Sequence, residues 1–194
     1  MKTLQIYKAV LSKDTHGIES IALVDSPAML NEWLMFSEQQ KETKFRFELN
    51  DEQRIITAPV IIPELPIYRK TKDGKEFYVV YDKETNMTVL QKYMSEGRQN
   101  AVKLTHSEGT EIEGVQVFEM FMSDNSRGIL APTGYKDLPD GTIYCSMKFH
   151  NESAWKLAKE GKINGVSLEG YFALEPIETL TDSEAQAIID AVIN

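Results

Sequence analysis

The sequence predicts a β-rich α+β domain, an open barrel or curled sheet flanked by about three helices. Short segments rich in β-branched and aromatic residues dominate the first 80 residues and recur as far as residue 174. Helical signals, which combine a capping residue with an apolar stripe, occur only three times. The chain of 194 residues is long enough to bury its own core, so we expect a single domain over 1–194 with its centre at about 18–173.

Turn residues separate the predicted strands. The Asp73-Gly74 pair predicts a hairpin between residues 66–69 and 77–80. Pro59 should confine its strand to the edge or the end of a sheet, because proline cannot donate a ladder hydrogen bond. The expected strands are 4–11, 19–24, 44–49, 54–62, 66–69, 76–81, 101–106, 115–122, 142–147 and 166–174.

The three predicted helices each have a capping signal. Asp82 or Thr85 caps the first, which runs to about residue 96, and Asn151 caps the second at 152–160. A capping box, Thr181 to Glu184, begins the C-terminal helix at about 182–193. Residues 123–140 form a long loop with few structural signals, and a loop of that length favours a binding or lid segment.

Composition excludes several functional classes. A formal charge of -9 without any block of Lys or Arg argues against nucleic-acid and anionic-membrane partners. The only cysteine, Cys145, cannot form an intrachain disulfide and lies in a predicted strand, where a core position is favoured. No stretch approaches the roughly 20 apolar residues of a membrane helix, and the N-terminus lacks the pattern of a signal peptide. We therefore expect a cytosolic protein.

No metal or cofactor site is predicted. His and Cys residues are too few and too widely spaced for a zinc site, and the acidic residues show no calcium-loop pattern. The chain also lacks the glycine-rich loops that bind phosphates and dinucleotides.

Nucleophilic hydrolysis needs a hydroxyl or thiol beside a base, and the chain has three histidines. His16 lies in a polar turn, where a surface role is favoured, and His150 precedes the Asn151 cap, where a structural role is favoured. His106 differs because it ends a predicted strand and begins a turn, so that it sits on a rigid element beside a potential cleft. It is the candidate base.

Ser167 is the candidate nucleophile. Gly165 and Gly170 bracket it, and residues without a side chain let another backbone approach closely, as a peptide substrate would. A buried strand serine that bonds a neighbouring carbonyl would show the same pattern. The local residues leave both interpretations open.

Four segments of the chain together resemble a known family. They are Ile21-Ala22-Leu23-Val24-Asp25-Ser26-Pro27-Ala28, residues 55–63 with Ile67-Tyr68-Arg69, Leu104-Thr105-His106, and Gly165-Val166-Ser167-Leu168-Glu169-Gly170-Tyr171-Phe172. In this order they resemble the procapsid (prohead) maturation proteases of tailed bacteriophages, over roughly residues 18–173. That family is similar in fold to the herpesvirus assemblins, serine proteases built on a β-barrel with surrounding helices.

The resemblance implies Ser167 as the nucleophile and His106 as the base. Assemblins use a second histidine after the serine, and this chain has none beyond residue 150, so an acidic residue is expected to orient His106. Glu119 is the first choice, because residues 115–122 are predicted to pair with the strand that bears His106. Glu169 is the alternative and should share a face with Ser167. Backbone N–H groups near Arg127 and Gly128 are candidate oxyanion donors.

The resemblance also implies a biological role. The expected activity is a serine endopeptidase inside the immature phage head, in the host bacterial cytoplasm, that cleaves the scaffold protein and the major capsid protein during head assembly. Association between copies is expected by analogy with the assemblins. Two alternatives remain open from the sequence: a catalytically inactive assembly or scaffold component with the same fold, and an esterase-like hydrolase.

Overall fold

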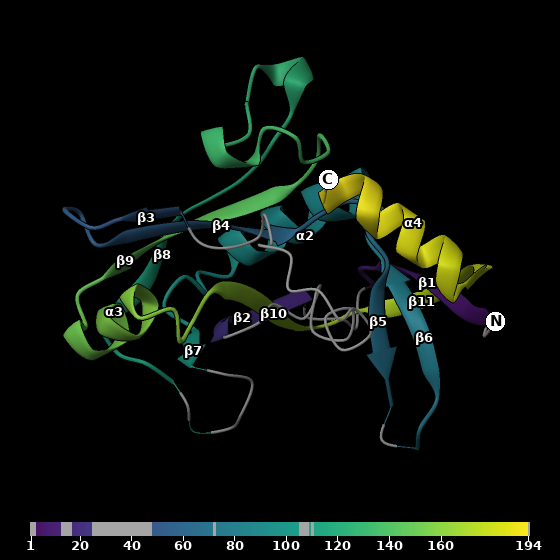
Figure 1. Cartoon of the computed structure of the whole chain (residues 1–194), viewed down its shortest axis with the longest axis horizontal. Helices are drawn as coiled ribbons and strands as arrows, with labels where there is room; N and C mark the ends of the chain where they lie inside the picture. Colours follow the sequence, from purple (N-terminus) through teal and green to yellow (C-terminus); the bar gives the residue numbers. More distant parts are fainter. Residues whose placement is uncertain are drawn as a thin grey trace.

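The computed structural model describes residues 3–12, 17–24, 48–71, 73–104, 109 and 111–193. This part of the chain is α+β, as predicted, and its strands lie in three sheets, none of which closes into a barrel (Figure 1). The strands are β1 Thr3–Val10, β2 Gly17–Val24, β3 Glu48–Asn50, β4 Ile55–Ile61, β5 Ile67–Lys70, β6 Glu76–Val80, β7 Val102–Leu104, β8 Val115–Met122, β9 Ile143–Phe149, β10 Gly165–Tyr171 and β11 Ala173–Thr181. The helices are α2 Lys83–Ser95, α3 Glu152–Lys159 and α4 Asp182–Ile193, with short 3-10 turns η1 Asn125–Arg127 and η2 Thr133–Tyr135.

The first sheet has the order β11-β1-β6-β5. β5 and β6 pair antiparallel, which confirms the predicted hairpin, whereas β1 runs parallel to β6. α4 lies along this sheet (Figure 1). Beneath the helix is a small apolar cluster separate from the main core, formed by Leu4, Ile6, Tyr78, Val80 and Ala185.

The second sheet has the order β10-β2-β7. Its outer strand β10 continues into β11 of the first sheet. β10 pairs with β2 and β11 pairs with β1, so residues 165–181 form one long edge interrupted at Phe172. The sequence predicted one strand over 166–174. That prediction was wrong: two strands lie here, and the second continues to Thr181. β11 is mostly exposed and carries Pro176 opposite Tyr7, beside a register shift, so it lacks the alternating pattern of a half-buried strand.

The third sheet has the order β3-β4-β9-β8 and is antiparallel throughout. Pro59 lies in β4, an interior strand of this sheet, so of the two predicted positions, the edge or the end of a sheet, the edge position was wrong. The position is tolerated because β3 reaches only as far as Thr57, and the register with β9 shifts between Pro59 and Ile61. At Pro59, therefore, no β3 residue lies beside β4. The N–H that proline lacks leaves no β3 carbonyl without a donor.

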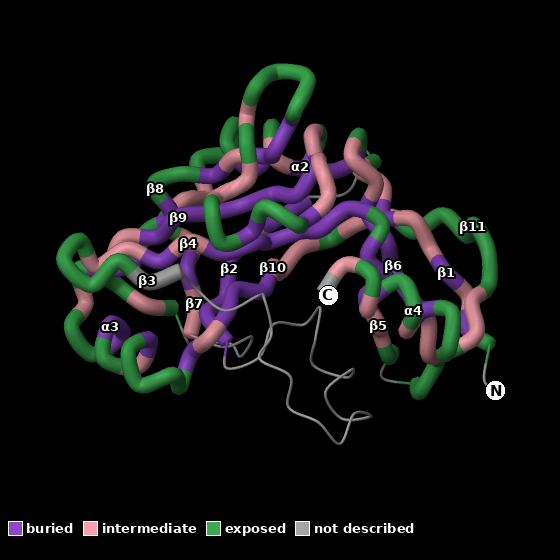
Figure 2. The backbone as a smooth tube through the Cα atoms, turned by 45° about the horizontal axis from the view of Figure 1, so that its top comes forward, coloured by how far each residue is buried: buried purple, intermediate pink, exposed green. Residues whose placement is uncertain are grey.

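The main core lies between the second and third sheets and under α2 and α3. β9 is buried at six of its seven residues and β2 at seven of its eight, as Figure 2 shows. Cys145 is part of this core, and burial raises the pKa of its thiol to about 12. The predicted core position of Cys145 is confirmed.

Side-chain caps begin the helices where the sequence indicated. Asp82, not Thr85, caps α2: its carboxylate accepts a hydrogen bond of 2.7 Å from the Thr85 N–H. Asn151 accepts a bond of 3.0 Å from the Ala154 N–H at the start of α3. The Thr181 N–H donates to the Glu184 carboxylate at 2.8 Å, which confirms the capping box before α4.

The loop after β8 is fastened to the start of α2 by Lys83. Its Nζ lies 2.6 Å from Asp140 Oδ2 and 3.3 Å from Asp124 Oδ1. The hydrogen bond from Lys83 holds the pKa of the Asp140 carboxyl below its usual value, with a further contribution from the Asn125 N–H. The loop is thus held by charge-assisted contacts as well as by its own 3-10 turns.

Candidate functional site

Ser167 lies in β10, on the outer strand of the second sheet. It is opposite Ala22 of β2, and Ala22 is opposite Lys103 of β7, so the three residues form one row across the sheet. Directly opposed residues project to the same face of a sheet. Ser167 is 5% exposed and is therefore held on a rigid, nearly enclosed strand.

Glu169 shares this face, because it follows Ser167 by two residues in an uninterrupted stretch of the ladder. Its Oε2 accepts a hydrogen bond of 2.7 Å from Ser20 Oγ and lies 2.7 Å from Lys103 Nζ. The two ionic side chains are each 22% exposed, so solvent screens their attraction only in part. One carboxylate thus connects β10, β2 and β7 on the face of the sheet that carries Ser167.

The candidate base, His106, lies outside the described residues, as does His16. The strand that leads to His106 is described: β7 ends at Leu104 and pairs in parallel with β2. His150 is exposed at the surface, and its N–H donates to the Gly114 carbonyl at 2.7 Å, so its backbone helps to anchor the start of α3.

The expected pairing around Glu119 was wrong. β8 pairs with β9, and β7, which precedes His106, pairs with β2. Sequence proximity had suggested a hairpin, but the almost fully buried β9 takes the place beside β8 and covers more apolar surface than the three-residue β7 could. Glu119 itself is exposed and belongs to a different sheet from Ser167.

Arg127 and Gly128 belong to the η1 turn after β8. Gly128 has a φ of 74°, the left-handed conformation expected of a glycine there. The Arg127 N–H already donates to the Asp124 carbonyl at 3.0 Å, and the Gly128 N–H donates to the Asn125 carbonyl at 3.2 Å. The turn also projects from the third sheet, apart from β10 (Figure 1). The structure does not bring these two donors to Ser167.

Gly170 has a structural role that the sequence did not indicate. A Cβ at this position would lie 2.2 Å from the Gly17 carbonyl oxygen. The backbone that approaches Gly170 is therefore β2 of the same chain, where the register of β10 shifts after Glu169. The space beside Gly170, which was expected to admit a substrate backbone, is filled by β2. Glycine is therefore required at this position for packing.

An open cavity of about 530 Å³ adjoins Glu169 and Lys103. It lies where β10 passes into β11 and faces the β5–β6 hairpin. Its walls combine aromatic and aliphatic side chains with four charged ones, and Phe172 packs edge-on against Tyr81 with ring centroids 5.2 Å apart. Sequence reasoning missed this cavity, because its lining comes from six strands and the short segments beside them.

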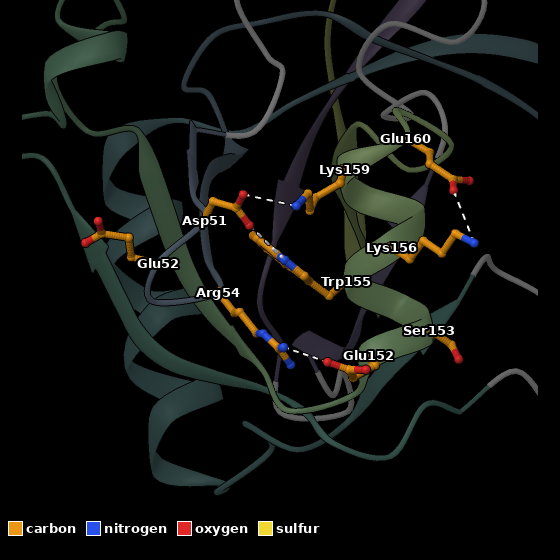
Figure 3. A pocket seen from close by; sticks show the side chains of 9 residues that line it. All are labelled: Asp51, Glu52, Arg54, Glu152, Ser153, Trp155, Lys156, Lys159 and Glu160. Carbon is orange, nitrogen blue, oxygen red and sulfur yellow. Dashed lines mark hydrogen bonds and ion pairs between the residues drawn. The ribbon is translucent and has the colours of Figure 1, made fainter.

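A larger open cavity of about 1010 Å³ lies between the β3–β4 turn and α3 (Figure 3). Two ion pairs cross it: Arg54 with Glu152 at 2.6 Å, and Asp51 with Lys159 at 3.0 Å. The Trp155 indole also donates to Asp51 at 3.2 Å. The hydrogen bond from Lys159 holds the pKa of the Asp51 carboxyl below its usual value. These pairs join α3 to the β3–β4 turn, so packing accounts for them.

Three further observations bear on the kind of site. Within the described part of the chain, no group of three or more His, Cys, Asp or Glu residues is placed to hold a metal ion. None of the helices described is long and apolar enough to span a bilayer. No protein-family model, curated protein or solved structure matches the chain.

Proposed function

We propose that the chain is a serine endopeptidase of the procapsid-maturation type, with Ser167 as nucleophile and His106 as base. The observation that carries this proposal is the row Ser167, Ala22 and Lys103 across the second sheet, with Glu169 on the same face. It supports the proposal because the strand of the nucleophile and the strand that leads to the base belong to one sheet.

Chain geometry sets a distance condition on this proposal. Leu104 is opposite Leu23, and Leu23 is opposite Val166, the residue before Ser167. His106 follows Leu104 by two peptide units of about 3.8 Å each, which limits how far it can lie from the end of β7. Two neighbouring strand spacings of about 4.8 Å separate β7 from β10. The imidazole alone spans only about half of that separation, so the proposed contact requires the two peptide units after Leu104 to lead toward β10.

In the proposed reaction, Ser167 Oγ attacks the scissile carbonyl while His106 accepts the hydroxyl proton. The C–N bond then breaks, and His106 returns the proton to the leaving amine. Water hydrolyses the acyl-enzyme by the same route and restores Ser167. We take Glu169 rather than Glu119 as the acidic member, because Glu169 shares the face of Ser167 and its negative charge would stabilise a protonated His106 nearby.

The biological part of the proposal rests on the sequence resemblance to phage prohead proteases. The substrates would be the scaffold protein and the major capsid protein, cleaved inside the procapsid in the host cytoplasm. Herpesvirus-assemblin-like folding and association of copies belong to this same proposal.

The test is cleavage of a co-expressed scaffold or capsid protein, followed by mass spectrometry of the products. Ser167→Ala and His106→Ala should each abolish cleavage and leave the melting temperature within a few degrees of the wild type. Ser153→Ala and His150→Ala are matched controls and should cleave normally, because both side chains are exposed and lie outside the proposed centre. A Ser167→Ala variant that still cleaves would refute the proposal.

One observation favours a second candidate, a non-catalytic assembly component of the phage head. Glu169 is already engaged by Lys103 and Ser20, and Ser167 is almost fully buried, as in a network that only ties three strands together. A fluorophosphonate probe separates the two functions. Covalent labelling of the wild type that disappears in Ser167→Ala supports the enzyme, and an unlabelled wild type that still promotes head assembly supports the structural role.

A further inference from the structure

The open cavity of about 530 Å³ beside Glu169 is here called the β10–β11 cavity. Its volume falls within the range of ligand pockets, about 300 to 1,000 Å³. We infer that it binds a large uncharged apolar side chain of an extended peptide. This inference deepens the proposed function and rests on it for the position of the peptide.

The aromatic part of the cavity wall favours an apolar occupant. Phe77 of β6, Tyr81 just after β6, and Phe172 contribute the aromatic surface. Their rings are fixed, because Phe77 packs edge-on against Tyr7 at 5.4 Å and Phe172 packs against Tyr81 at 5.2 Å. Rigid aromatic surface binds apolar groups at little entropic cost.

The charges around the cavity argue against a charged occupant. Lys103 and Glu169 neutralise each other at 2.7 Å. The two other ionic side chains of the lining, Arg69 and Glu19, carry one charge of each sign. A charged ligand group would gain no net attraction and would lose hydration against the aromatic wall.

The mouth of the cavity carries exposed apolar residues. Tyr171 is 64% exposed and Leu174 is 40% exposed, and both line the opening. Large apolar side chains held in water beside a concave site are typical of ligand-binding surfaces. An incoming side chain would cover them.

The position of the cavity sets a register for the peptide. Glu169 lines the cavity and lies two strand residues from Ser167, which is about 6.7 Å along an extended chain. A peptide that runs along β10 advances at the same rise per residue. Its cavity-binding side chain is then two positions from the residue whose carbonyl Ser167 attacks, on the same face of the peptide.

The inference is tested with positional-scanning libraries of short fluorescein-labelled peptides, in which one position is fixed as Phe, Leu, Ala, Asp or Lys. Binding to the full-length Ser167→Ala variant is measured by fluorescence anisotropy, and cleavage by the wild type is measured separately. Pools fixed as Phe or Leu should bind at least about tenfold tighter than those fixed as Ala, Asp or Lys. In the cleavage assay this preference should appear two positions from the cut.

Variants at the mouth make the test specific to the cavity. In the Ser167→Ala background, Leu174→Glu and Tyr171→Glu should each reduce the preference for Phe over Ala to less than about threefold. Ile177→Glu is the matched control and should keep the full preference. Ile177 lies on β11 with Leu174 and is 54% exposed, but it does not line the cavity.

The outcomes separate the two proposals. If the wild type cleaves no peptide but the Ser167→Ala variant shows the cavity-dependent preference, the peptidase function is refuted and the binding site stands. If all pools bind alike, or if Leu174→Glu and Tyr171→Glu keep the preference, the inference is overturned whatever the cleavage assay shows.

Discussion

Gly170→Ala should destabilise the protein strongly, although it adds a single methyl group. Gly170 has no positive φ, so its backbone conformation suits any residue and the requirement for glycine is one of space. The new Cβ would lie 2.2 Å from the Gly17 carbonyl oxygen and 3.0 Å from the Ile18 Cα, whereas ordinary contact begins at 3.4 Å. β2 and β10 must therefore move apart by about 1 Å at this point.

The cost follows from what that movement disrupts. Gly170 is opposite Ile18, and Tyr171 is opposite Gly17, so two positions of the ladder are disturbed. Weakened hydrogen bonds cost about 0.5 to 1.5 kcal/mol each, and overpacking adds about 1 to 3 kcal/mol. We expect a loss of about 3 kcal/mol in the free energy of unfolding, which for a chain of this length lowers the melting temperature by about 6 to 12 °C.

Urea unfolding followed by circular dichroism and thermal scans measure this loss. Gly128→Ala is the control: a Cβ there meets nothing within 4 Å, and its φ of 74° alone should cost about 1 kcal/mol. A Gly170→Ala variant that loses less free energy than Gly128→Ala would refute the close approach of β2 and β10.

Two further predictions concern charges. A double-mutant cycle of Lys103→Met and Glu169→Gln, measured by urea unfolding, should give a coupling energy of about 1 to 2 kcal/mol. This value lies between those of exposed and of fully buried ion pairs. A coupling energy below about 0.5 kcal/mol would contradict the 2.7 Å contact. Because the Lys83 contact lowers the folded-state pKa of Asp140, its stabilisation should be complete above the ordinary carboxyl pKa, about 4, and should vanish as the pH falls through the lowered value. Asp140→Asn should therefore be less stable than the wild type at neutral pH and should approach it in acid, and a stability difference that stays constant into acid would count against the contact.

Local chemistry was enough to predict most of the secondary structure. The Asn151 cap, the Thr181 capping box and the Asp73-Gly74 hairpin act within a few residues, so their signals are complete in the sequence. Elements whose stability comes from distant partners were harder to predict. β11 is exposed and carries Pro176, and it is a strand because β1 lies beside it.

The sequence by itself determined the α+β class, the caps and the choice of Ser167 as the candidate nucleophile. Only the tertiary structure decided the neighbours of Ser167. Glu169 meets Ser20 and Lys103 because β10 and β7 flank β2, a pairing that joins segments from three distant parts of the chain. Strand order depends on which apolar faces bury best against each other, and that is a property of the whole core. For the same reason, Glu119 lies in a different sheet from Ser167, and the backbone of Gly17 packs closely against Gly170.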